Sequence, residues 1–241
     1  MKKLSLLILA GLLLPFVIAA QKPKAKSEPQ PVPKFEADKF KAVKWRNIGP
    51  FRGGRANTIS GVIGNDNIYF VGYTGGGISK TEDAGITWKN VSDGFFKVGS
   101  IGKIVVSESD PNVIYVGSGE HAVRGVMTSY GDGVYKSTDA GKTWKNIGLE
   151  KSRHISDVAI HPHNPEIVWV AAQGPVHGPG GERGVFKSVD GGSTWKRTLF
   201  VDDNTGVSSL SIDMTNPRIL YAATWQHRRY PWKVEIGRAH V

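Results

Sequence analysis

The side chains best suited to chemistry in this chain are arginines, histidines and a glutamate in irregular, glycine-containing stretches. In Gly49-Pro50-Phe51-Arg52-Gly53-Gly54-Arg55, two arginines stand beside glycines, where a ligand can approach the backbone closely. Paired arginines suit recognition of a carboxylate or phosphate, although bridging between neighbouring structural units is an equally open role. Binding sites often lie on loops held by a rigid scaffold. The predicted ligand-binding residues are Arg52, Arg55, Glu120, His121, Arg124, His154, Arg183, His227 and Arg228.

Metal or cofactor chemistry has little support in the sequence. His161-Pro162-His163 looks like a ligand pair, but a metal site needs more than two ligands. Gly75-Gly76-Gly77 is no phosphate loop, because no helix follows it. We therefore expect no metal site and no cofactor.

A repeated eight-residue pattern, [Ser/Thr]-x-Asp-x-Gly-x-Thr-Trp, must position these residues. It occurs at 81–88, 137–144 and 188–195, and its tryptophans are 56 and then 51 residues apart. Such a period indicates a repeat architecture. In each copy, aspartate can accept hydrogen bonds from turn N–H groups and glycine supplies a positive φ. The residues assigned to these turns are Asp83, Gly85, Trp88, Asp139, Gly141, Trp144, Asp190, Gly192 and Trp195.

Runs of Val, Ile, Tyr and Trp between the turns predict a four-stranded unit that recurs along the chain. The units are expected at about 57–98, 99–150, 151–203 and, incompletely, 204–235. Strands in the second position suit burial on both faces. The segment 225–232 is expected to be a polar loop, on the face opposite the repeated turns. Trp45-Arg46-Asn47-Ile48-Gly49 copies Trp144-Lys145-Asn146-Ile147-Gly148, and this suggests an outer strand that completes a ring.

The turn pattern resembles the Asp-box, or BNR repeat, of sialidases, sortilin-type receptors and xyloglucanases. The segments 47–55, 131–137, 182–188 and 223–226 are further similar to exported bacterial proteins described as sortilin-like or BNR-repeat glycosyl hydrolase-like. This resemblance implies an all-β fold, a β-propeller of four-stranded blades. The chain would form an open arc of about three and a half blades, as an N-terminal fragment.

The resemblance implies two classes of function. One is an exported module that binds an extracellular peptide, protein or glycan. The other is a glycoside hydrolase, which needs two carboxyl groups about 5 to 9.5 Å apart. The catalytic candidates are Glu120 and Glu182, and neither has an evident partner. The sialidase Phe/Tyr-Arg-Ile-Pro segment is absent, because Gly-Gly follows Phe51-Arg52, and residues 56–64 lack the early aspartate of xyloglucanases. We favour binding, and enzymatic activity stays open.

The two ends of the chain differ from its body. Residues 1–20 have Lys2 and Lys3, an apolar run and Ala19-Ala20, as in a cleaved signal peptide with no lipobox, so we expect a secreted, periplasmic or cell-surface protein without stable membrane insertion. Residues 21–44 form a Lys/Pro-rich linker, and residues 236–241 are expected to be a non-native tail. The linker holds seven Lys against three acidic residues, so the formal charge of +10 does not indicate a nucleic-acid surface on the body.

Overall fold

A computed structural model describes residues 54–121, 129–230 and 232–237, which all belong to one compact unit, Gly49–Val241. The expected signal peptide, linker and Trp45–Gly49 strand lie outside the described residues, as do Arg52 and Arg124 and residues 238–241 of the expected tail. The described part of the chain contains no helix long and apolar enough to span a membrane.

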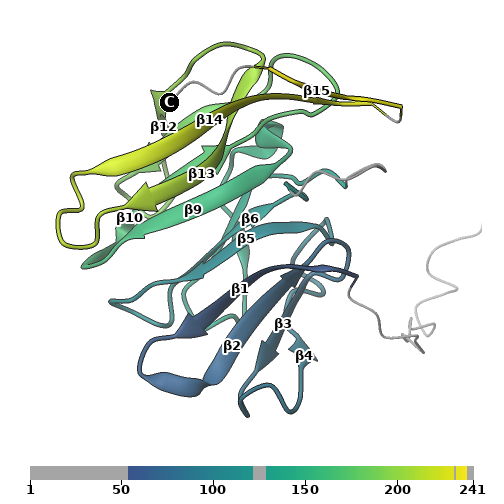
Figure 1. Cartoon of the computed structure of the whole chain (residues 1–241). Coiled ribbons are helices and arrows are strands. Elements are labelled where there is room, and N and C mark those ends of the chain that lie inside the picture. Colours follow the sequence, from purple (N-terminus) through teal and green to yellow (C-terminus); the bar gives the residue numbers. More distant parts are fainter. Residues whose placement is uncertain (1–53, 122–128, 231, 238–241) are drawn as a thin grey trace, which may run out of the picture. The chain divides into compact units, whose positions relative to one another are not determined.

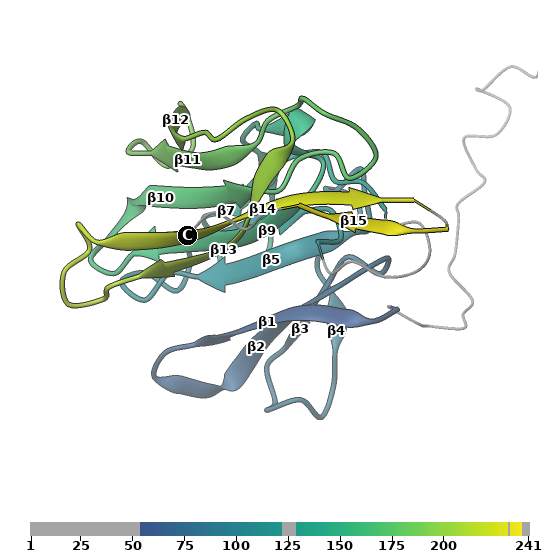
Figure 2. The same ribbon diagram turned by 45° about the horizontal axis from the view of Figure 1, so that its top comes forward.

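The described chain is all-β, as the sequence predicted, and forms four antiparallel sheets (Figures 1 and 2). Sheet 1 contains β1 (Ala56–Val62), β2 (Asn65–Tyr73), β3 (Ile78–Thr81) and β4 (Lys89–Asn90). Sheet 2 contains β5 (Ile101–Val106), β6 (Ile114–Ser118), β7 (Val134–Ser137) and β8 (Lys145–Asn146). Sheet 3 contains β9 (Ile155–His161), β10 (Asn164–Ala172), β11 (Gly184–Ser188) and β12 (Lys196–Leu199), and a short 3₁₀ turn, η2 (Glu150–Ser152), precedes it. In each of these sheets the strands are hydrogen-bonded in chain order.

Sheet 4 differs from the sequence prediction. It contains β13 (Thr205–Ile212), β14 (Leu220–Arg229) and β15 (Val234–Ile236). The predicted loop at 225–232 is wrong for residues 225–229, which continue β14. Trp225 and Gln226 pair with β13, and residues 227–229 pair with β15. Ile236, placed at the start of the expected tail, pairs with His227 in this ladder. Backbone hydrogen bonding between β14 and β15 therefore forms a strand pair where the polar composition predicted a loop.

Consecutive sheets pack face to face through three apolar cores. Ile114 and Val116 of β6 pack in the core shared with sheet 1, whereas Tyr115, between them, packs in the core shared with sheet 3. All five residues of β6 are buried, because successive side chains of a strand point to opposite faces. A third core joins sheets 3 and 4 through Trp169, Val207 and other residues.

The innermost strands β1, β5, β9 and β13 approach each other closely and are joined by side chains that bond to backbone. The Asn57 amide donates to the Ile101 carbonyl at 2.9 Å, and the Thr58 hydroxyl accepts from the Ile104 N–H at 3.1 Å. Ser156 donates to the Val207 carbonyl at 2.5 Å. Polar side chains on the inner strands thus satisfy backbone groups that no strand ladder reaches.

We predict that Gly102→Ala destabilises the protein, because a Cβ at this position would lie 2.0 Å from the Ile155 carbonyl oxygen. Overpacking of this kind typically costs about 1–3 kcal/mol. The control is Gly178→Ala, where an added Cβ meets nothing within 4 Å. Urea denaturation measures both. Equal stability of the two variants would contradict the close approach of β5 and β9.

The three repeated turns join β3 to β4, β7 to β8 and β11 to β12 with the same hydrogen bonds. In the second turn, Asp139 accepts from the Ser137 hydroxyl at 2.8 Å, the Thr143 N–H at 2.9 Å and the Thr143 hydroxyl at 2.6 Å. Asp83 and Asp190 accept from the equivalent groups. Hydrogen bonds from the turn threonine, with others from the turn, lower the pKa of Asp83 and of Asp190 to about 2. These aspartates hold the turns as carboxylates.

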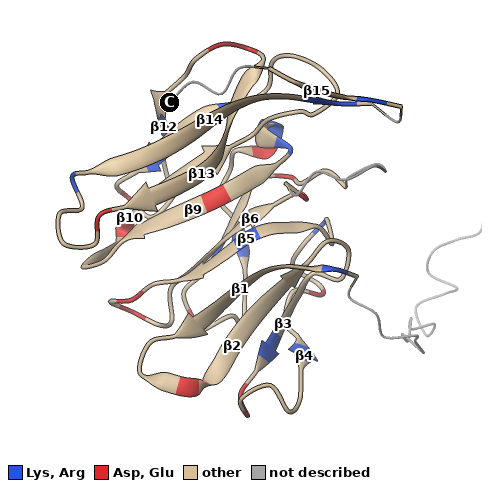
Figure 3. Cartoon of the chain, viewed as in Figure 1, with Lys and Arg blue, Asp and Glu red and all other residues tan. Residues whose placement is uncertain are grey.

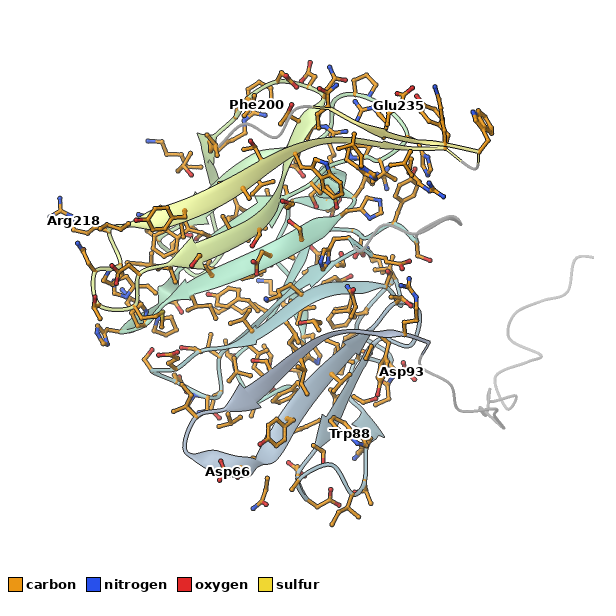
Figure 4. The ribbon with its side chains drawn as sticks, in the orientation of Figure 1. Asp66, Trp88, Asp93, Phe200, Arg218 and Glu235 are labelled. Carbon is orange, nitrogen blue, oxygen red and sulfur yellow. The ribbon has the colours of Figure 1, made fainter. Side chains whose placement is uncertain are left out.

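The tryptophans of the second and third turns pack toward the preceding sheet, whereas that of the first turn does not. Trp144 is 7 % exposed and donates its indole N–H to the Val91 carbonyl of sheet 1 at 2.9 Å. Trp195 donates to the Ile147 carbonyl of sheet 2 at 2.8 Å and is partly buried. Trp88 is 41 % exposed and donates within its own turn to Gly85 (Figure 4). The repeated pattern predicts that all three tryptophans are buried between neighbouring units. This prediction is wrong for Trp88, because no described sheet precedes sheet 1.

The different burial of Trp144 and Trp88 predicts that their replacement by alanine lowers stability by different amounts. Trp144→Ala removes a buried side chain and should cost about 3–5 kcal/mol. Trp88→Ala should cost far less, because the Trp88 ring already contacts solvent. Denaturant titration followed by circular dichroism compares the variants. A similar loss for both would contradict the packing of Trp144 between sheets.

Candidate functional site at the ends of the strands

Because the strands of each sheet are antiparallel and follow chain order, successive loops lie at alternating ends of the sheets. At one end lie the repeated turns and the first turn of each sheet, including those with Asp66 and Arg218 (Figure 4). The opposite end, which we call the strand-end face, carries the connections between sheets and those between second and third strands. Asp93 and Glu235 mark this side in Figure 4. The described residues predicted as ligand-binding are at or next to strand ends on this face: Arg55, Glu120, His121, His154, Arg183, His227 and Arg228.

Two of the predicted residues form an ion pair. The Arg55 guanidinium contacts the Glu120 carboxylate, which is buried, whereas the Arg55 side chain is about half exposed. His121, next in the chain, lies 3.4 Å from the Asn57 amide, and burial lowers its pKa. The pair therefore joins the start of β1 to the end of β6.

A second group on this face, which we call the strand-end cluster, contains more of the polar side chains. Its members come from the ends of β10 and β14 and from three connections: Tyr130, His154, Gln173, His177, Trp225, His227 and Arg229. The Tyr130 ring centroid is 5.3 Å from that of His154 and 6.0 Å from that of His177. The Trp225 and His227 ring centroids are 4.5 Å apart. The Gln173 N–H donates to the His154 carbonyl at 2.9 Å.

Several polar groups of the cluster are buried without a hydrogen-bond partner among the described residues. They are both ring nitrogens of His154 and of His227, and both side-chain polar atoms of Gln173. His154 is 0 % exposed. An unpaired buried polar group typically costs about 1–3 kcal/mol, so a concentration of such groups in one place requires an explanation.

The two imidazoles are held neutral by their surroundings. Burial, then the like charges of His177, His121, Arg183 and His227, lowers the pKa of His154 to about 3. Burial, then Arg228 and Arg229, lowers the pKa of His227 to about 4. Each neutral imidazole presents one hydrogen-bond donor and one acceptor at neutral pH.

Other predicted residues have structural contacts. The guanidinium of Arg183 is buried and donates to the carbonyls of Gln173, Pro175, Gly178 and Gly180, so it holds the connection between β10 and β11. Burial, then the like charge of Arg228, lowers the pKa of Arg183 to about 10.

Arg228 and Glu182 are also engaged. Arg228 donates to the His227 carbonyl at 2.9 Å and to the Asn204 side chain at 2.6 Å. The Glu182 carboxylate accepts from the Lys151 N–H at 2.8 Å. We therefore leave Arg183, Arg228 and Glu182 out of the candidate ligand site.

A groove of about 580 Å³ runs along the innermost strands. Asn57, Lys103, His121 and Asp157 line it, with Ser208, Ser209 and other residues. Lys103 and Asp157 form an ion pair at 3.0 Å, and Asp157 also accepts from the Leu210 N–H at 3.0 Å. His121 connects this groove to the strand-end face, because it lines the groove and also acts electrostatically on His154.

Within the described residues, no group of three or more His, Asp or Glu side chains is arranged to hold a metal ion. The His161–His163 pair lies at the β9–β10 turn, where the His163 N–H donates to the His161 Nδ1 at 3.2 Å. Sequence reasoning did not select Tyr130, Gln173, His177, Trp225 or Arg229 as site residues. The alternation of Trp225, His227 and Arg229 could have indicated one face of a strand.

Comparison with known proteins identifies the fold. No protein-family model and no curated protein matches the chain. An ancestral GH74 enzyme matches with a TM-score of 0.55 and 19 % identity, over 75 % of this chain and 24 % of that one. The GH74 enzyme of Niastella koreensis matches with a TM-score of 0.54 and 24 % identity, over 70 % and 25 %. The extracellular domain of a one component system from B. thetaiotaomicron gives 0.50 and 14 %, over 75 % and 22 %.

The described sheets are part of a β-propeller fold. That fold is shared by the GH74 enzymes and the B. thetaiotaomicron domain. The chain spans about a quarter of the length of the two GH74 enzymes. Similarity at this level of identity establishes the fold, and the role of the strand-end cluster rests on its own geometry.

The neutral imidazole of His154 predicts acid sensitivity. An unfolded histidine has a pKa near 6.5, and that of folded His154 is about 3. Between these values the unfolded chain binds a proton that the folded chain does not, so stability should fall as the pH drops from 6.5 toward 3. His154→Gln should flatten this dependence, whereas His163→Gln, at an exposed turn, should leave it nearly unchanged. Denaturation at several pH values tests this, and an equal slope in wild type and His154→Gln would contradict it.

Proposed function

We propose that this protein is an exported sortilin-like Asp-box propeller module that binds a glycan at the strand-end cluster. The observation that carries the proposal is the set of neutral, buried groups on His154, Gln173 and His227 that have no hydrogen-bond partner among the described residues. Together they offer both donors and acceptors, which is what a sugar hydroxyl requires, since it donates and accepts. Two partly exposed aromatic rings, Tyr130 and Trp225, lie beside them.

The chemistry of the cluster favours a glycan over a peptide or protein partner. Binding sites of this kind combine aromatic surface with a few placed polar groups. A β-sheet edge for an added peptide strand would instead present unpaired backbone, whereas the unpaired groups here belong to side chains. Because the polar atoms are closed off from solvent, binding requires the neighbouring rings to shift.

Hydrolysis has weaker support than binding. Hydrolysis needs two carboxyl groups about 5 to 9.5 Å apart, and the Glu120 carboxylate already forms an ion pair with Arg55. Glu182 is occupied by the Lys151 N–H. An assay for reducing ends released from any bound polysaccharide tests this directly, and we expect no release.

Binding is tested with the full chain against a panel of soluble polysaccharides by isothermal titration calorimetry. Trp225→Ala and Tyr130→Ala should each weaken binding about tenfold, since a tenfold change is about 1.4 kcal/mol and aromatic contacts contribute about that much. Tyr221→Ala is the control, because Tyr221 is also on β14 but is 68 % exposed. Tryptophan fluorescence should change on binding in the wild type and less in Trp225→Ala. Equal affinities in all variants, or binding of peptides alone, would contradict the proposal.

A further inference from the structure

The second half of β14 presents three different functional groups on one face. Trp225, His227 and Arg229 alternate along this strand, and His227 and Arg229 pair with Ile236 and Val234 of β15. Successive residues of a strand point to opposite faces, so these three share a face and Arg228 lies on the other. Figure 3 shows basic residues gathered along this part of the β14–β15 hairpin.

Arg229 is a buried cation with an unused donor. Its side chain is 9 % exposed, and its Nε has no hydrogen-bond partner in the described part of the chain. Its backbone is fully used, because its N–H donates to the Val176 carbonyl at 2.9 Å and its carbonyl lies 2.7 Å from the His177 Nδ1. The position of Arg229 is therefore fixed, while its side chain is left unpaired at Nε.

The neighbouring arginines show how the fold pairs a buried guanidinium elsewhere. Arg183 donates to four backbone carbonyls, and Arg228 donates to a carbonyl and an asparagine side chain. A buried charge without such partners is costly. Arg229, unlike its neighbours, has a buried Nε that no described residue pairs with, so an external acceptor could bond to it once the neighbouring rings shift.

The surroundings favour an anionic acceptor. His227, two residues away on the same face, is buried, and neither of its ring nitrogens has a partner in the described part of the chain. Burial, then the positive charges of Arg228 and Arg229, lowers its pKa and keeps it neutral. Its ring can donate a hydrogen bond to an oxygen held by Arg229. Guanidinium presents a planar pair of donors that matches the two oxygens of a carboxylate. The Trp225 ring, 4.5 Å from that of His227, gives an apolar surface beside this charge.

We propose that Trp225, His227 and Arg229 recognise a carboxylate-bearing sugar, a uronic acid unit of the glycan. Arg229 binds the carboxylate, His227 donates to the carboxylate or an adjacent hydroxyl, and the sugar ring stacks on Trp225. This inference rests on the proposed glycan binding and adds the charge of the ligand. It predicts that the protein distinguishes an acidic sugar from a neutral sugar of the same shape.

The experiment uses the full chain with trimers of galacturonate and of glucuronate, each compared with its methyl ester. Esterification removes the charge and leaves the sugar backbone unchanged. Calorimetry should show at least one acidic trimer binding about tenfold or more tighter than its ester. Arg229→Met should abolish this preference, and Arg229→Lys should restore part of it. Lys233→Met is the matched control, because it removes one positive charge from half-exposed Lys233 beside β15.

Each outcome separates the two proposals. Equal binding of acid and ester overturns carboxylate recognition and leaves glycan binding intact, as does binding of neutral polysaccharides alone. Displacement of a bound uronate trimer by hexaglutamate at equal concentration overturns the sugar and supports an acidic peptide. Failure to bind any polysaccharide overturns the proposed function itself. If Arg229→Met does not fold, the preference of the wild type for acid over ester still decides the question.

Discussion

The constraint on which the structure depends is the close approach of the innermost strand of each sheet to the backbone of the next. At Gly102 a single added carbon would collide with the Ile155 carbonyl, and at Gly206 it would collide with the Gln173 carbonyl. Between these strands, the side chains of Asn57, Thr58 and Ser156 bond to backbone groups of the neighbouring strand. The inner strands therefore set the spacing of the sheets, and the apolar cores fill the space between them.

The two ends of the strands differ in how their polar groups are satisfied. At one end the repeated turns satisfy their own polar groups, because each aspartate accepts bonds from its own turn. At the strand-end face the connections are longer and irregular, and their polar side chains reach into a shared region. There the guanidinium groups of Arg183 and Arg228 have hydrogen-bond acceptors, whereas nitrogens of His154, His227 and Arg229 have no partner among the described residues. Each unpaired buried group lowers stability, and this cost is the basis of the proposal that a ligand supplies the missing bonds.

The fold could be predicted from the sequence because the repeated turn is stabilised by contacts within its own residues. Its Asp, Gly and Thr form a set of bonds within eight residues, so their pattern predicts the turn without knowledge of distant contacts. The extension of β14 could not be predicted in this way, because its strand depends on pairing with β15. Trp88 has the same local sequence as Trp144 but a different burial, since burial depends on which sheet precedes it. The roles of Arg228 and Arg229 likewise depend on the face of the strand, which composition does not reveal.

The tryptophan contacts have a consequence for how such a chain can be lengthened or shortened. The indole donors of Trp144 and Trp195 each belong to one repeat, and their carbonyl acceptors, Val91 and Ile147, belong to the repeat before it. The hydrogen bond of each of these two tryptophans therefore joins its own repeat to the preceding repeat. Duplication of a whole repeat creates a new donor together with a new acceptor, so every added unit arrives able to join both neighbours. Duplication of a partial repeat would leave one of the two unmatched, and heritable changes in length should therefore occur in whole repeats.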